Sequence, residues 1–309
     1  MASPIKYANH DSVNGMQSGD EMNQRNSVAE GGIPPEALEV MKRIDARRRH
    51  FDRNLKISLA VMVALLIGGL VVLGLNFKFM GKWLGFILTG LGFTLMVSVF
   101  AIILACIFSV LGALGRLSRN PILNGMATLY VSLIRGTPLL VQVYMWYLAL
   151  PQIGGALQNL GFTGIQKYLT LPAIPAGILA LAVCYGAYMT EIMRAGIQSI
   201  KIGQTEAAKA LGMTGAQTMR RVIFPQALQV IIPPVSNEFI AMVKDSSLVS
   251  LMGVWELSFR AIKIGRRYFQ SLEMLVLVAM IYWVMCIILQ AVQERIEKHM
   301  ARGERGEHG

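Results

Sequence analysis

Five stretches of this chain contain no charged residue over at least 20 consecutive positions, and no other feature limits its possible folds as strongly. They cover residues 57–77, 83–115, 136–166, 168–190 and 274–293. About 20 apolar residues in a helix are enough to cross the hydrocarbon core of a bilayer, whereas a buried helix of a soluble protein seldom runs so far without a polar face. We therefore predict an all-α fold, a polytopic bundle of membrane helices.

Composition agrees with this class and excludes others. Charged residues make up 15% of the chain, against about 25% in soluble domains. Cys106, Cys184 and Cys286 all lie inside apolar stretches, which predicts small buried side chains and no metal site or disulfide framework. The net charge of +11 is better explained by basic cytoplasmic loops than by a nucleic-acid partner.

The chain divides into a polar N-terminal extension, residues 1–56, and a membrane part. Seven basic residues fall between positions 42 and 56, and such a segment favours the anionic cytoplasmic leaflet. We therefore expect both termini, including a tail at 299–309, to be cytoplasmic. The six expected spans are about 57–77, 85–113, 123–150, 172–194, 226–250 and 272–294.

One region fits this topology poorly. The segment 256–271 carries Arg260, Lys263, Arg266 and Arg267, which would lie outside, although basic residues favour cytoplasmic loops. A loop that dips partly into the membrane would explain the misfit. A misplaced fifth span would explain it equally well.

Two of the expected spans are interrupted by proline. Residues 135–138 read Arg-Gly-Thr-Pro in the third span, and Pro233 and Pro234 follow each other in the fifth. Proline removes a backbone donor and kinks or breaks a helix, and paired interruptions often mark a transport site. Ordinary proline kinks relieved by neighbouring helices are the alternative.

The polar connection at 203–225 reads as two short helices joined by a sharp turn. Its first half is rich in alanine, Gly212 suits a left-handed position after the last turn, and Thr214 with Gln217 forms a capping box. Pro225 disfavours helix at Phe224 and marks the next boundary. On physical grounds alone this segment is either an amphipathic helix on the membrane surface or a docking element.

The residue pattern favours docking. Glu206-Ala207-Ala208, followed by Leu211-Gly212 and then Pro225, resembles the coupling loop of binding-protein-dependent ABC importer permeases. The resemblance implies a cytoplasmic helix pair that fits a cleft on an ATPase subunit, where small alanines allow backbones to approach closely. The implied coupling residues are Glu206, Ala207, Ala208, Gly212 and Pro225.

Four further motifs narrow the resemblance to the polar-amino-acid (histidine/glutamine-type) permeases. They are Gly-x-x-x-Thr-Leu at 90–95, Arg-Gly-Thr-Pro at 135–138, the stretch 186–196, and the stretch 233–248 with its Pro-Pro and Lys-Asp-Ser-Ser-Leu sequences. The resemblance covers residues 85–298, and it implies that the first span with its external loop, 57–84, is an addition to a five-span core.

Membership of such a family would imply partners and a location. The expected partners are an ATP-binding subunit dimer, a second permease subunit that is identical or homologous, an external substrate-binding protein, and membrane lipid. The expected location is the inner (plasma) membrane of a bacterium.

The chain lacks the features of an enzyme. It contains no Gly-x-x-x-x-Gly-Lys-Ser/Thr sequence, so ATP and Mg²⁺ are expected on a separate subunit, and it has no cluster that would bind a metal or perform catalysis. The alternative function is an ion- or proton-coupled secondary amino-acid transporter. That alternative would account for the broken helices but leaves 203–225 unexplained.

A zwitterionic substrate needs both an anionic and a cationic partner. Glu191 shares a helical face with Tyr188 and Arg194, and charged groups at membrane depth usually face a cavity or a partner. Either Glu191 pairs with Arg194, or it helps to line a polar cavity. The candidate substrate-binding residues in the second case are Arg135, Thr137, Gln142, Tyr188 and Glu191.

Overall fold

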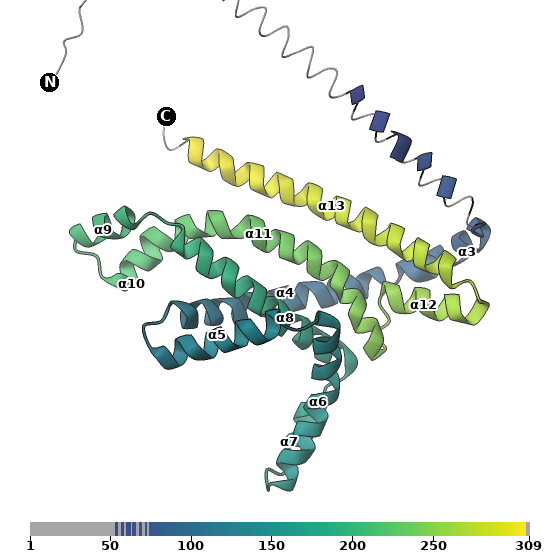
Figure 1. Ribbon diagram of the computed structural model, residues 1–309, viewed down its shortest axis with the longest axis horizontal. Helices are drawn as coiled ribbons and strands as arrows, with labels where there is room; N and C mark the ends of the chain where they lie inside the picture. The colour runs from purple at the N-terminus through teal and green to yellow at the C-terminus, as the bar shows by residue number, and fades with distance from the viewer. Residues whose placement is uncertain are drawn as a thin grey trace, which may run out of the picture. The chain divides into compact units, whose positions relative to one another are not determined.

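A computed structural model gives the structure of the chain (Figure 1). It describes residues 74–306 without a gap and, before them, residues 53, 54, 57, 58, 60–62, 64, 65, 68, 69 and 72, with side chains up to residue 298. The chain forms two compact units, Met1–Leu75 and Asn76–Gly309. The extension predicted at 1–56 and much of the span predicted at 57–77 lie outside the described residues. The other predicted domain boundaries stay predictions.

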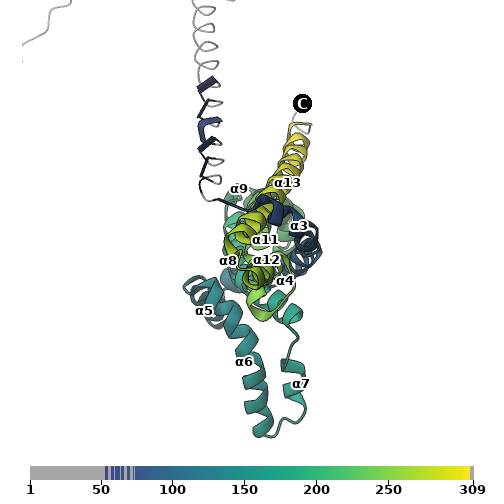
Figure 2. The same ribbon diagram turned by 90° about the vertical axis from the view of Figure 1, so that its right-hand side faces the viewer.

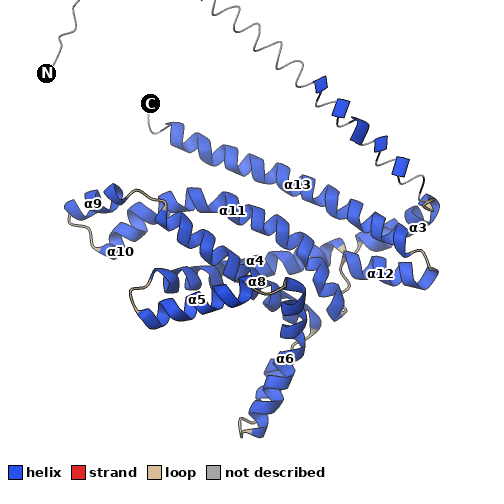
Figure 3. Cartoon of the chain, viewed as in Figure 1, coloured by secondary structure: helices blue, strands red, loops and turns tan. Residues whose placement is uncertain are grey.

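The described part of the second unit is built from helices, with no strand (Figure 3), as predicted. A π-helical turn, η1 (Met219–Ile223), precedes α11, and a 3₁₀ helix, η2 (Ser246–Met252), follows it. The α-helices are α3 (Phe77–Leu88), α4 (Leu91–Leu117), α5 (Pro121–Arg135), α6 (Leu139–Asn159), α7 (Ile165–Leu169), α8 (Ala173–Gln198), α9 (Ile202–Ala210), α10 (Gly215–Thr218), α11 (Phe224–Asp245), α12 (Leu257–Tyr268) and α13 (Ser271–Gly306).

Three helices of the described chain are long and apolar enough to cross a membrane alone: α4, α8 and α13. The bent pair α5 and α6 gives a fourth crossing if the two form one span. The predicted fifth span corresponds to α11, which does not meet the same criterion of length and hydropathy. Its polar residues Ser236, Asn237 and Glu238, which follow soon after two prolines, lower its hydropathy. The helical membrane class is confirmed, with three or four spans by this criterion.

The core of the second unit lies between α4 and α8, which form the most extensive helix pair among the described residues. On α4 the buried face carries small residues, including Ala101, Ala105 and Gly112. On α8, a Cβ added to Gly186 would come within 2.7 Å of the Phe108 Cβ. Small residues let the backbones of two membrane helices approach closely, whereas large apolar side chains would hold them apart.

The predicted break after Arg135 is confirmed. α5 ends there, α6 begins at Leu139, and the two axes differ by 111°. Gln142 is buried and bridges the break, because its Nε2 donates to the carbonyl oxygens of Ile134 at 2.6 Å and Thr137 at 2.9 Å. Backbone groups freed inside a membrane protein must find such partners.

The predicted break at Pro233 and Pro234 is wrong. Both prolines lie inside α11, which continues from Phe224 to Asp245. Each proline removes one backbone donor, but neighbouring helices in a membrane bundle can accommodate such a loss without ending the helix. The chain leaves the α-helical path only after Asp245, where η2 begins.

The segment whose charges did not fit the predicted topology forms α12. Glu256, fully buried, caps this helix and accepts hydrogen bonds from the backbone nitrogens of Ser258 at 2.8 Å and Phe259 at 2.7 Å. Tyr282 of α13 donates to the same carboxylate at 2.8 Å. A Cβ added to Gly90 would lie 2.8 Å from the Glu256 carbonyl carbon, so the glycine at the start of α4 lets α12 pack against it.

Candidate functional site

The polar connection between α8 and α11 forms the two short helices that its sequence predicts. We call residues 202–223 (α9, α10 and η1) the coupling segment; in Figure 1 it lies at the end of the second unit remote from α3 and α12. Gly212 ends α9 with a φ of +77°, as predicted. Its nitrogen donates to the Lys209 carbonyl at 2.9 Å, and that of Met213 donates to the Ala208 carbonyl at 3.1 Å.

The start of α10 also forms as predicted. The Gln217 nitrogen donates to the Thr214 hydroxyl at 3.3 Å, and the Thr214 nitrogen donates to the Gln217 side chain at 2.9 Å. The expected boundary at Phe224 needs correction, because Phe224 is already helical and Pro225 lies in the first turn of α11. α10, η1 and α11 follow one another without a gap, so the chain is helical from Gly215 to Asp245 and Pro225 comes just after the π-helical turn.

Most of the expected coupling residues are exposed. Glu206, Ala207, Gly212 and Pro225 face outward, whereas Ala208 is buried. Glu206 is the fifth residue of α9 and so lies beyond the first turn, where the positive end of the helix dipole acts. Ile202 and Leu211 are 76% and 81% exposed. The segment thus exposes two large apolar side chains.

Glu191 lies in a network of two arginines. One carboxylate oxygen accepts from the Arg116 Nε at 3.1 Å, and the other accepts from the Arg194 Nη2 at 2.7 Å. Arg116 also donates to the Thr128 hydroxyl, so the network joins α4, α5 and α8. The pairing with Arg194 weighed from the sequence is present, and Arg116 is a second partner that the sequence did not indicate.

A different set of polar side chains meets where α5, α8 and α11 come together. The Tyr185 hydroxyl donates to Asp245 at 2.7 Å, and its ring lies 6.4 Å from that of Tyr188. The Arg135 guanidinium lies 5.4 Å from the Tyr188 ring centroid. Glu238 is half-buried, and its carboxylate is repelled by the charge of Asp245 and attracted by that of Arg135. We call these five residues the tyrosine–carboxylate cluster.

Two members of this cluster carry charges that form no ion pair with the described residues. Glu238 makes no hydrogen bond or ion pair with the described residues, and Arg135 makes no ion pair with them. An ionisable side chain that lies among membrane helices usually has a functional role. The structure therefore brings together two of the predicted substrate residues, Arg135 and Tyr188.

The other three predicted residues have internal partners. Thr137 and Gln142 bond each other across the α5–α6 break, with the Gln142 Nε2 at 2.7 Å from the Thr137 hydroxyl, and Cys184 donates to the Gln142 oxygen at 2.7 Å. Glu191 is held by its two arginines. Their role in substrate binding stays a prediction.

Sequence reasoning missed Glu238 and Asp245 as site residues. The available signal was their spacing of seven, which places both on one face of a helix two turns apart. Both residues follow Pro233 and Pro234 in the chain, so this spacing holds whether or not the helix continues through the prolines.

Residues 109–302 match the family described as binding-protein-dependent transport system inner membrane components. This match covers more than half of the chain. The chain belongs to this family. As a family member it is a transport component of the inner membrane, and nothing in the comparison favours the ion-coupled alternative.

Individual relatives agree with the family match. The permease is 38% identical to the L-cystine transport system permease protein TcyB of Bacillus subtilis, over 69% of this chain and 86% of the relative. It is 39% identical to the arginine transport system permease protein ArgU of Corynebacterium glutamicum, over 68% of this chain and 66% of that one. A solved amino acid ABC transporter with histidines has 36% identity and a TM-score of 0.64, over 73% of this chain and 99% of that one.

Proposed function

We propose that this permease is the membrane-spanning subunit of an ATP-driven importer of polar amino acids. The named relatives transport cystine and arginine, and the solved transporter contains histidines. All three substrates carry an ammonium and a carboxylate group. A translocation path for them must therefore present both signs of charge.

The observation that carries the proposal is the presence of two opposite charges, Arg135 and Glu238, that form no ion pair with the described residues. Arg135 offers a guanidinium fork, which matches a carboxylate in shape and charge. Glu238 offers a carboxylate for an ammonium group, and Tyr188 offers an aromatic surface beside it. We assign the ammonium contact to Glu238 because both oxygens of Glu191 already accept hydrogen bonds from arginines.

The chain would work with separate partners. An ATP-binding subunit would dock at the coupling segment, whose exposed Ile202 and Leu211 offer apolar contacts, and that subunit would hold ATP and Mg²⁺. A second permease subunit and an external substrate-binding protein would complete the importer. The basic segment between residues 42 and 56 favours cytoplasmic termini.

Uptake in proteoliposomes tests the substrate site. The complex of permease, ATPase subunit and binding protein would be reconstituted with radiolabelled L-arginine, L-histidine and L-cystine. We expect Glu238→Gln and Arg135→Gln each to lower uptake about tenfold or more, because each removes a charged hydrogen-bond partner of the substrate.

A matched control is Glu294→Gln, which neutralises an exposed carboxylate on α13 paired with Lys298 and should leave uptake unchanged. Co-purification of the ATPase subunit checks that each variant assembles. Uptake at the wild-type rate in both Glu238→Gln and Arg135→Gln would show that the cluster does not contact the substrate.

A further inference from the structure

The end of the second unit opposite the coupling segment carries an unusual concentration of unpaired positive charge. α3 contributes Lys78 and Lys82, and α12 contributes Arg260, Lys263, Arg266 and Arg267. None of these forms an ion pair with residues 74–298. The acidic residues nearby in sequence are Glu256, which is buried, and Glu273, so the cations outnumber them. Figure 2 faces this end.

Aromatic rings lie beside four of these cations, Lys82, Arg260, Lys263 and Arg267. The Tyr268 ring of α12 lies 5.6 Å from Phe79 and 5.4 Å from Trp83 of α3. The Lys82 ammonium lies 5.8 Å from the Trp83 centroid, and the Arg267 guanidinium lies 5.7 Å from that of Tyr268. Tryptophan and tyrosine beside lysine and arginine are typical of the level of lipid headgroups. We call this surface the cationic belt.

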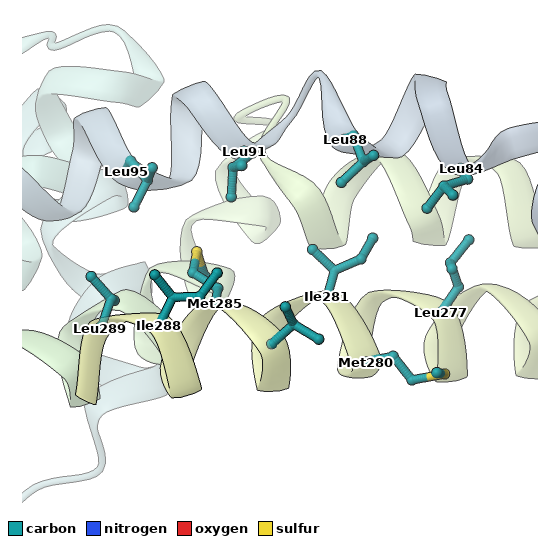
Figure 4. Close-up of a pocket in the computed structure, with 11 residues that line it drawn as sticks. Leu84, Leu88, Leu91, Leu95, Leu277, Met280, Ile281, Met285, Ile288 and Leu289 are labelled. Carbon is teal, nitrogen blue, oxygen red and sulfur yellow. The ribbon is translucent and has the colours of Figure 1, made fainter. Parts of the chain in front are cut away.

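An apolar groove begins beside the belt. It has a volume of about 520 Å³ and runs between α3 and α4 on one side and α13 on the other (Figure 4). Leu84 and Leu277 face each other at one end, and Leu95 and Leu289 lie at the other (Figure 4). Leu84 is two residues from Lys82 of the belt, about 3 Å along the axis of α3, although the two side chains point to different sides of that helix. All the residues that line the groove are Leu, Ile, Val or Met.

The length of the groove matches one leaflet. From residue 277 to residue 289 a helix rises about 18 Å, and half of a hydrocarbon core measures about 15 Å. Within the described part of the second unit the groove side chains are left uncovered, with Val284 50% and Ile288 59% exposed. An acyl chain that entered at Leu84 would therefore extend along the whole groove.

We propose that the cationic belt and the groove together form a binding site for one anionic phospholipid, with its phosphate at the belt and an acyl chain in the groove. Charge complementarity selects this occupant, because zwitterionic lipids would leave the excess positive charge unbalanced. The site also gives a reason for the basic residues of 256–271, which do not fit the positive-inside pattern.

Native mass spectrometry on the intact transporter complex tests this proposal. The complex would be titrated with dioleoyl phosphatidylglycerol and, separately, with dioleoyl phosphatidylcholine at low salt. We expect the wild type to retain the anionic lipid preferentially. The double variant Lys82→Gln with Arg267→Gln should bind phosphatidylglycerol about 30-fold more weakly, at about 1 kcal/mol per neutralised cation. Its retention of phosphatidylcholine should stay the same.

Two further variants separate the parts of the site. Val284→Trp fills the groove and should lower the retention of both lipids, which a charge change does not do. Lys167→Gln removes an exposed lysine on α7, away from the belt, and should change neither. Together these results would support the site.

Three results would overturn the proposal. The wild type could retain both lipids equally. The double variant could keep its lipid preference but lose affinity for the external binding protein, which would make the belt a protein-docking surface. Met280→Cys could form a disulfide across two permease subunits, which would show that a second copy covers the groove.

Discussion

Glu191 is the residue whose structural and transport roles a single substitution can separate. Its carboxylate joins Arg116 of α4 to Arg194 of its own helix, and all three side chains are less than a third exposed. We expect Glu191→Gln to lower the free energy of unfolding by about 1.5–3 kcal/mol, because hydrogen bonds to charged groups are lost. Thermal unfolding of the purified complex measures this.

Uptake by the same variant shows which role dominates. If Glu191 is only a structural partner, the surviving folded fraction should transport at the wild-type rate. An unchanged melting temperature combined with a loss of uptake would contradict the structural role and restore the substrate role predicted from the sequence.

Residue contacts between distant helices were the least predictable part of the site. Tyr188 and Arg194 were expected on the face of Glu191 because helical spacing fixes that relation. The contact of Arg135 with Tyr188, 5.4 Å from ring centroid to guanidinium, depends on how α5 crosses α8. No spacing within either helix determines that crossing, so the sequence could name both residues but not their contact.

Among the elements, the turn in the coupling segment depends most strongly on the residue type at a single position. Gly212 has a φ of +77°, a conformation that costs other residues about 1–2 kcal/mol, and a β-branched residue is the least suited to it. We expect Gly212→Val to change the angle between α9 and α10 and to abolish substrate-stimulated ATP hydrolysis in reconstituted membranes, although the permease still inserts.

Space around Gly212 makes this test specific. A Cβ at this position would meet no atom within 4 Å, so a loss of function would come from the backbone angle and not from a clash. Gly203, an open glycine of α9, gives the control Gly203→Ala. Normal coupling in Gly212→Val would favour the alternative in which this segment is a membrane-surface helix.

Local chemistry decides which elements could be predicted. The glycine turn and the Thr214 cap form from neighbours within a few residues, so the sequence predicts them correctly. Whether Pro233 and Pro234 end a helix depends on what surrounds the carbonyls that they leave without donors. For this reason the prediction that proline interrupts the helix is correct at Pro138 and wrong at the two prolines of α11.

At the scale of the whole molecule, one buried carboxylate ties together the beginning and the end of the second unit. Glu256 caps α12 and accepts from Tyr282 of α13, while the Leu257 nitrogen donates to Thr94 of α4 at 3.4 Å. The Gly-x-x-x-Thr-Leu motif at 90–95 was visible in the sequence only as a family pattern. Its physical role emerges from this packing, because Gly90 makes room for Glu256 and Thr94 bonds the next residue.

Burial gives this junction a pH dependence. Desolvation raises the pKa of the Glu256 carboxyl above its usual range, against the opposing effect of its hydrogen bonds from Ser258, Phe259 and Tyr282. A carboxyl whose pKa is higher in the folded state contributes stability that is fully present below its unfolded pKa of about 4.3 and is lost as pH rises through the folded value. We therefore expect the melting temperature of the wild type to fall, relative to that of Glu256→Gln, as pH rises from about 4.5 to about 7.5.

Melting curves of the two proteins in one detergent measure the difference. Because every other titrating group is shared, parallel curves across this range would mean that Glu256 is ionised in the fold at all these pH values and that its three hydrogen bonds outweigh its burial.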